Sequence, residues 1–85
     1  MEELYDLKIL AVDDEARICN LIEEILSAAG FRQIQTAQSC AEARQAFRKF
    51  QPDAVVLDVM LPDGDGFALM QEFRRATNVP ILFLS

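Results

Sequence analysis

The sequence predicts an α/β fold, a doubly wound parallel sheet with helices on both faces. Three short apolar runs, at 8–12, 54–57 and 81–84, suit strands buried within a sheet rather than strands with one wet face. Between these runs lie segments whose apolar residues recur at helical spacing. Strands that alternate with helices in this way form parallel sheets with right-handed crossovers.

The first strand, 8–12, stops at Asp13 and Asp14, and its apolar run suits burial on both faces. A helical pattern follows and ends at Gly30, since glycine commonly stands just past the last helical turn. The apolar positions of this helix are Ile18, Leu21, Ile22, Ile25, Leu26 and Ala29. Residues 33–37 predict a second, short strand.

The second helix is predicted by its capping residues. Ser39 is typical of an N-cap, and Glu42 three residues later completes a capping box for a helix that reaches Phe50. The third strand, 54–57, is again an apolar run that ends in an acid, Asp58.

A turn-rich stretch, 61–66, leads into a third helix that closes at Asn78, and 81–85 forms the fourth strand. Leu69, Met70, Phe73 and Ala76 mark the apolar stripe of this third helix. We expect four aromatic residues in the core: Phe47, Phe50, Phe67 and Phe73.

Composition limits the function. A chain of 85 residues suits one small domain. Fourteen acidic residues against eight basic ones argue against direct binding of nucleic acid. The absence of histidine and of a CxxC pair excludes the usual zinc sites, and Cys19 and Cys40 are interpreted as free thiols. No signal peptide or membrane-length apolar run is present, so we expect a cytoplasmic location.

Acidic residues stand at the carboxyl ends of two predicted strands, Asp13 and Asp14 after the first and Asp58 after the third. Ligands gather at this edge of open α/β sheets, so neighbouring strands would bring the three carboxylates together. Two unit charges about 4 Å apart repel by roughly 4 kcal/mol at an effective dielectric near 20. We therefore expect a cation, and Mg²⁺ is the natural candidate because it prefers oxygen ligands. A carboxylate can also attack phosphorus and form an aspartyl-phosphate.

Each acidic residue also has a simpler interpretation. Asp13 or Asp14 could cap the helix that follows, and we expect one of them to do so. Asp58 taken alone would be a turn residue. Asp63 and Asp65 fit ordinary turn chemistry beside two glycines, and we assign them no catalytic role.

A specific spacing, D-x-x-x-P-x-x-D-G, runs from Asp58 to Gly66. Together with the acidic pair after the first strand and a hydroxyl residue, Ser85, after the fourth, it resembles the receiver domain of two-component response regulators. The resemblance covers Lys8 to Ser85 and implies a flavodoxin-like fold with strand order 2-1-3-4. The stretches LPDGDGF and VPILFLS are most similar to regulators with a winged-helix DNA-binding output domain.

The resemblance implies a role for each matching residue. Asp58 would accept a phosphoryl group from a sensor histidine kinase. Asp13 and Asp14 would hold Mg²⁺ with Asp58, and the backbone carbonyl of Met60 would supply a further ligand. Ser85 would bond the phosphoryl group and reorient when it arrives. The domain would then be a regulatory phosphoacceptor rather than an enzyme.

The family pattern continues beyond Ser85 with a helix, a fifth strand that carries a lysine, and a last helix. We therefore expect residues 1–85 to be an incomplete receiver domain, a piece of a longer regulator, in which phosphorylation is impaired without that lysine. The apolar strand 81–84 would then lie at an open edge of the sheet, and we expect self-association through it.

Three other functions remain as alternatives. A haloacid-dehalogenase-like phosphotransferase would need a second aspartate two residues after the nucleophile, where Met60 stands. A flavodoxin-like electron carrier would need a glycine- and hydroxyl-rich loop after the first strand. A protein-interaction module that is not phosphorylated would need neither feature.

Overall fold

Ten helices and strands follow one another along residues 2–84, the part of the chain that the computed structural model describes. They are α1 (Glu2–Tyr5), β1 (Lys8–Val12), α2 (Ala16–Ala29), β2 (Gln33–Ala37), α3 (Cys40–Phe50), β3 (Ala54–Asp58), β4 (Met60–Leu61), β5 (Gly64–Asp65), α4 (Gly66–Ala76) and β6 (Ile81–Leu84).

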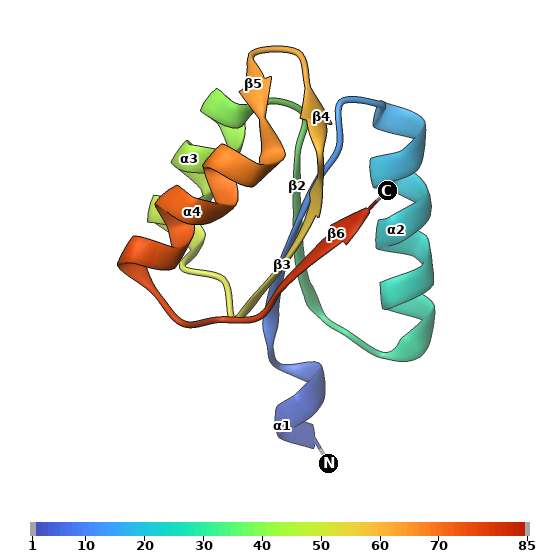
Figure 1. The fold of residues 1–85 in the computed structure, drawn as a ribbon. Coiled ribbons are helices and arrows are strands. Elements are labelled where there is room, and N and C mark those ends of the chain that lie inside the picture. The colour runs from blue at the N-terminus through green and yellow to red at the C-terminus, as the bar shows by residue number, and fades with distance from the viewer. Residues whose placement is uncertain (1, 85) are drawn as a thin grey trace.

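Four of the strands form one parallel sheet in the order β2-β1-β3-β6. β6 is the fourth strand of this sheet in chain order, so the observed order corresponds to the predicted order 2-1-3-4, which is confirmed. α2 covers one face, and α3 and α4 cover the other (Figure 1). The doubly wound arrangement that alternation predicted is therefore confirmed as well.

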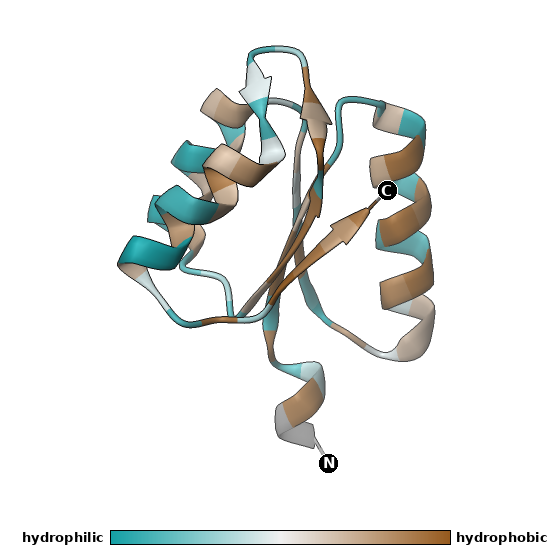
Figure 2. Cartoon of the chain, in the orientation of Figure 1, coloured by the Kyte–Doolittle hydropathy of each residue, from teal (hydrophilic) through white to brown (hydrophobic). Residues whose placement is uncertain are grey.

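The core lies between the central strands and the α3–α4 pair. Leu10, Ala11 and Val12 of β1 are fully buried, as the apolar run predicted. Figure 2 shows the central strands as apolar, whereas the helices alternate between apolar and polar residues along their length. On the α3–α4 side the ring of Phe47 stacks on that of Phe73, with 4.1 Å between ring centroids. Complete burial of a side chain such as Phe73 stabilises a fold by roughly 1.5–3 kcal/mol.

The ends of α3 and α2 illustrate different capping. The Oγ of Ser39 accepts the N–H of Glu42 at 3.1 Å, so the predicted N-cap of α3 is confirmed. The N-cap of α2 is Glu15, whose side chain makes no capping bond, so the expectation that Asp13 or Asp14 caps this helix is wrong. The carboxylate of Asp13 instead accepts the N–H of Glu15 at 2.9 Å, which holds the chain in a turn before the helix starts.

Two small elements were not predicted. α1 is a single turn, too short for any periodic pattern, and its Tyr5 ring meets Phe31 edge-on with 5.5 Å between ring centroids. The backbone carbonyl of Tyr5 also accepts the N–H of Arg32 at 3.1 Å, so contacts distant in sequence hold this turn. β4 and β5 form a two-stranded antiparallel hairpin that overlaps the predicted turn region, 61–66, and starts one residue before it.

Two of the four aromatic residues expected in the core are found there: Phe73 is buried, and the half-buried Phe47 packs against the buried cluster. Phe50 is half-buried outside that cluster, and Phe67 is 49% exposed. Phe67 lies in the first turn of α4 and packs against Phe83 of β6, with 4.8 Å between ring centroids. Phe67 lies at the edge of the apolar stripe of α4, and this explains why a core position was wrongly predicted for it. Within residues 2–84, no helix combines the length and apolarity needed to cross a bilayer.

Candidate metal site

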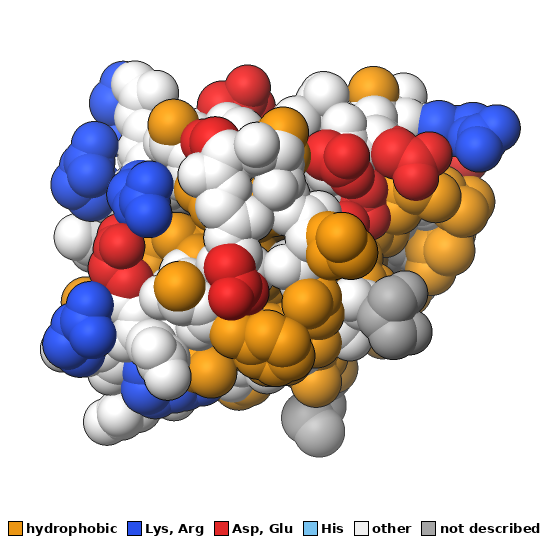
Figure 3. Space-filling view, turned by 45° about the horizontal axis from the view of Figure 1, so that its top comes forward, with side chains coloured by type: hydrophobic (Ala, Val, Ile, Leu, Met, Phe, Trp, Pro, Cys, Tyr) orange, Lys and Arg blue, Asp and Glu red, His pale blue; other side chains and the backbone are white. Residues whose placement is uncertain are grey.

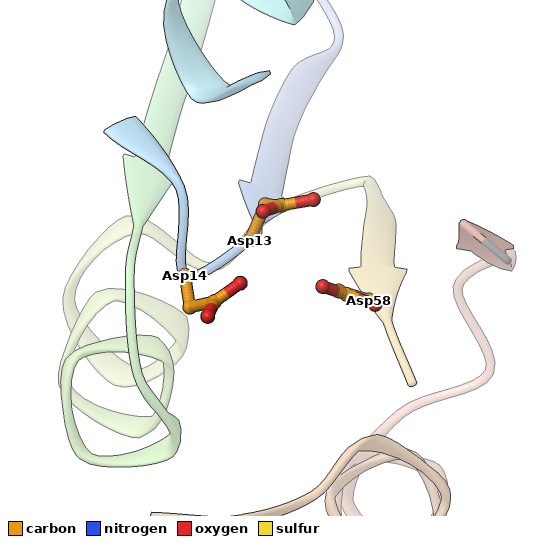
Figure 4. A group of neighbouring side chains, drawn as sticks. All are labelled: Asp13, Asp14 and Asp58. Carbon is orange, nitrogen blue, oxygen red and sulfur yellow. The ribbon is translucent and has the colours of Figure 1, made fainter. Parts of the chain in front are cut away.

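Three acidic side chains lie together where β1 and β3 end. The two strands are parallel neighbours with Val12 level with Leu57, so the next residues, Asp13 and Asp58, also emerge at one level of the sheet. Carboxylate oxygens of Asp13, Asp14 and Asp58 lie within 4.8 Å of one another. Figure 4 shows the three side chains facing the same space between the two strand ends. The register of the sheet is therefore what assembles this group.

Asp13 is the most constrained member of the group. It is only 6% exposed, and its backbone N–H donates to the carbonyl of Ala37 at 3.0 Å. Burial raises the pKa of Asp13 above its ordinary value, and the charges of Asp58 and Asp14 raise it further, while the N–H of Glu15 opposes the shift. Ionisation of this carboxyl is therefore costly unless a cation lies beside it.

Within the described residues, no basic side chain forms an ion pair with Asp13, Asp14 or Asp58. The ion pairs found there are Arg17–Glu15, Arg32–Asp6 and Arg44–Glu72. Figure 3 turns this end of the molecule toward the viewer and shows Asp and Glu side chains near its centre, with most Lys and Arg side chains on one side. A donor set of carboxylate oxygens with unbalanced negative charge fits a hard divalent cation, and Mg²⁺ in particular.

The segment after Asp58 folds back over the strand end. The N–H of Met60 donates to Oδ1 of Asp58 at 3.3 Å, while the Met60 side chain is 78% exposed. Gly66 closes the loop, and its N–H donates to the carbonyl of Val59 at 2.7 Å. A Cβ at Gly66 would lie 2.2 Å from the backbone oxygen of Asp58, so only glycine fits there. Ser85, the other predicted site residue, lies outside the described residues.

Two residues near the site had no predicted role. The thiol of Cys19 donates to the backbone oxygens of Asp13, at 3.3 Å, and Ala37, at 3.7 Å, and so ties α2 to the ends of β1 and β2. Asp63 accepts hydrogen bonds from the backbone of α3. The sequence signal for Cys19 is its place one turn into the helix after the acidic pair. No comparable signal exists for Asp63, whose bonding partners are more than twenty residues away.

Comparison with known proteins places these observations in a family. The sequence model of one protein family, the response regulator receiver domain, matches residues 9–85. The probable transcriptional regulator ycf27 of Pyropia yezoensis is 47% identical over 78 residues, which cover 92% of this chain and 32% of that protein. The transcriptional regulatory protein GltR of Pseudomonas aeruginosa is 42% identical over 80 residues, which cover 91% of this chain and 33% of that protein.

A solved structure agrees with the sequence relatives. A two-component response regulator from Clostridium difficile superposes with a TM-score of 0.87 at 31% identity, over 92% of this chain and 64% of that one. The chain thus spans about a third of the length of the curated relatives and about two thirds of this solved chain.

Proposed function

The chain belongs to the response regulator receiver family, and we propose that its Asp58 accepts a phosphoryl group from a sensor histidine kinase. The observation that carries this proposal is the group of three carboxylates, with oxygens within 4.8 Å, where two neighbouring strands end. Asp58 is the member of the group that continues into the D-x-x-x-P-x-x-D-G segment.

In the proposed reaction, a carboxylate oxygen of Asp58 attacks the phosphorus of a phosphohistidine. The P–O bond to Asp58 forms as the P–N bond to the kinase imidazole breaks, and the imidazole leaves with the electron pair. Asp13, Asp14 and the backbone carbonyl of Met60 would hold Mg²⁺ together with Asp58. When bound, the ion neutralises negative charge on the transferring group. Ser85 would bond the phosphoryl oxygens through its hydroxyl.

The proposed role is regulatory and cytoplasmic, without turnover of a separate substrate. Residues 1–85 would act as a receiver unit that passes its phosphorylation state to an output domain. A winged-helix DNA-binding domain is the output that we propose, because the relatives include transcriptional regulators of about three times this length.

Self-association is a second part of the proposal. Within residues 2–84, β6 pairs with β3 on one side and with no strand on the other, so in residues 1–85 taken by themselves this second edge presents backbone donors and acceptors. Leu82 and Phe83 on this strand are 65% and 38% exposed. We propose that two copies of the chain pair along this edge.

Incubation with acetyl phosphate and Mg²⁺ tests the acceptor directly. Because phosphorylation of residues 1–85 is expected to be impaired without the lysine that the resemblance places beyond Ser85, we expect partial conversion to a single phosphoryl adduct by intact mass. Hydroxylamine should release this adduct, as it does acyl phosphates, and peptide mapping should locate it on Asp58. Asp58→Asn should remove the adduct. Asp65→Asn is the matched control, because it makes the same chemical change in the same loop and asparagine still caps α4.

An adduct on a different residue, or one that persists in Asp58→Asn, would contradict the proposal. A folded chain that acquires no adduct, even when it is extended to include the lysine that the resemblance places beyond Ser85, would favour the alternative of an interaction module that is not phosphorylated.

A further inference from the structure

Asp63 joins the hairpin that follows Asp58 to a helix far away in sequence. Its two carboxylate oxygens accept the backbone N–H groups of Cys40, at 2.7 Å, and of Ala41, at 3.0 Å. These donors belong to the first turn of α3, where backbone N–H groups have no partner within the helix. A carboxylate at this position also meets the positive end of the helix dipole.

The helix does not need Asp63 as its only cap. The N–H of Glu42 already donates to the Oγ of Ser39, and the N–H of Ala43 donates to the Ser39 backbone oxygen. Both bonds are local to α3, whereas the Asp63 bonds cross between two elements. The Asp63 bonds are therefore the ones that join the hairpin to α3.

The hairpin is fixed at its base and at its tip. At the base, Gly66 donates to Val59 and approaches Asp58 too closely for any side chain. Near the tip, between β4 and β5, Asp63 binds the start of α3. Met60 lies between these two anchors, opposite Asp65 in the hairpin. Movement of the tip would therefore displace the backbone of Met60 relative to Asp58.

We propose that Asp63 is a positioning residue, which holds the hairpin against α3 so that the backbone of Met60, whose N–H donates to Oδ1 of Asp58 at 3.3 Å, keeps its place beside that carboxylate. This inference rests on the proposed metal site and adds a residue to it that touches neither metal nor phosphoryl group. Residues that orient metal ligands typically change metal affinity about 10- to 100-fold when they are replaced.

Mn²⁺ binding followed by electron paramagnetic resonance tests the proposal, with Mn²⁺ as the probe for the divalent site. We expect Asp63→Ala to weaken binding about tenfold, and Asp63→Asn, which retains one acceptor oxygen, to fall between Asp63→Ala and the wild type. Ser39→Ala is the matched control, because it removes a cap from the same helix end without touching the hairpin. We expect its Mn²⁺ affinity to equal that of the wild type.

Hydrogen exchange of the amides in 60–66 provides a readout that needs no metal. Faster exchange there in Asp63→Ala but not in Ser39→Ala would support the tether. Equal exchange and equal Mn²⁺ affinity in these two variants would overturn it and leave Asp63 as a helix cap only. A wild type that binds no Mn²⁺ would reject the metal site of the proposed function and the Met60 role with it, while the exchange result would still decide whether the tether exists.

Discussion

On one face of the sheet, α3 and α4 bury Ala43, Leu69 and Phe73 against the central strands, whereas on the other face α2 buries only Cys19. Leu21 and Ile25 of α2 remain 49% and 59% exposed. Leu82 of β6, at one edge of the sheet, is 65% exposed as well. One side of the molecule is a closed core and the other is an open apolar surface.

This difference shows what a helical pattern can and cannot predict. The apolar stripes of α2 and α4 are equally regular in the sequence, and both helices form where the stripes predict them. The spacing of the apolar residues predicts which side of a helix faces the sheet. It does not predict how much of that side other parts of the chain cover. Coverage depends on neighbours that the periodicity of one segment does not contain.

The largest difference between the two sides should appear in stability. Phe73→Ala leaves a cavity in the closed core and should lower the free energy of unfolding by about 3–5 kcal/mol. Ile25→Ala removes a side chain from the open surface and should change it by about 0.5 kcal/mol or less. Urea denaturation followed by circular dichroism measures both. Similar losses in the two variants would mean that the open side is covered in solution.

Association should respond on the open side only. Lysine on an edge strand discourages pairing with another chain, so Leu82→Lys should shift the protein toward monomer in sedimentation velocity. Gln71→Lys makes the same change of charge on an exposed position of α4 and should sediment as the wild type does. A wild type that is already monomeric throughout the concentration range would refute pairing through β6.

The smallest expected effect on stability concerns Asp63, whose hydrogen bonds join the hairpin to α3 on the covered side of the sheet. The N–H groups of Cys40 and Ala41 hold the pKa of Asp63 below its ordinary value. Because the pKa is lowered in the folded state, the stabilisation is present above the ordinary aspartate pKa of about 4 and is lost as pH falls through the folded-state value. The Cys40 thiol and Arg44 are the nearby groups, and both keep their protonation state over this range.

Thermal unfolding of the wild type and Asp63→Asn from neutral to acid pH checks this. At neutral pH the wild type should have a higher midpoint of thermal unfolding than Asp63→Asn, and the difference between the two midpoints should disappear in acid. A difference that stays constant down to the lowest pH would show that ionisation of Asp63 is irrelevant.

Much of the site was predictable because it depends on strand ends. Asp13 and Asp58 end apolar runs, and parallel strands end at the same edge of a sheet. That β1 and β3 are neighbours followed from the family resemblance and not from the apolar runs themselves. The position of Asp63 against α3 was not predictable, since a turn aspartate has the same local sequence whether or not a helix end lies beside it. The turn of α1 depends likewise on Tyr5 meeting Phe31, a contact between residues that no local pattern connects. Asp13 was misassigned as a possible cap because a turn before a helix and a cap share the same residue types.

The central claim is that the acidic group binds a divalent cation, and thermal unfolding with and without Mg²⁺ tests it most directly. A ligand that binds only the folded state, at ten times its Kd, adds about 1.4 kcal/mol to the free energy of unfolding. We expect Mg²⁺ to raise the wild-type midpoint. We also expect Asp58→Asn to be more stable than the wild type without metal, because one repelling charge is removed, and to respond less to Mg²⁺. No Mg²⁺ shift in the wild type, or an equal shift in Asp58→Asn, would contradict the claim.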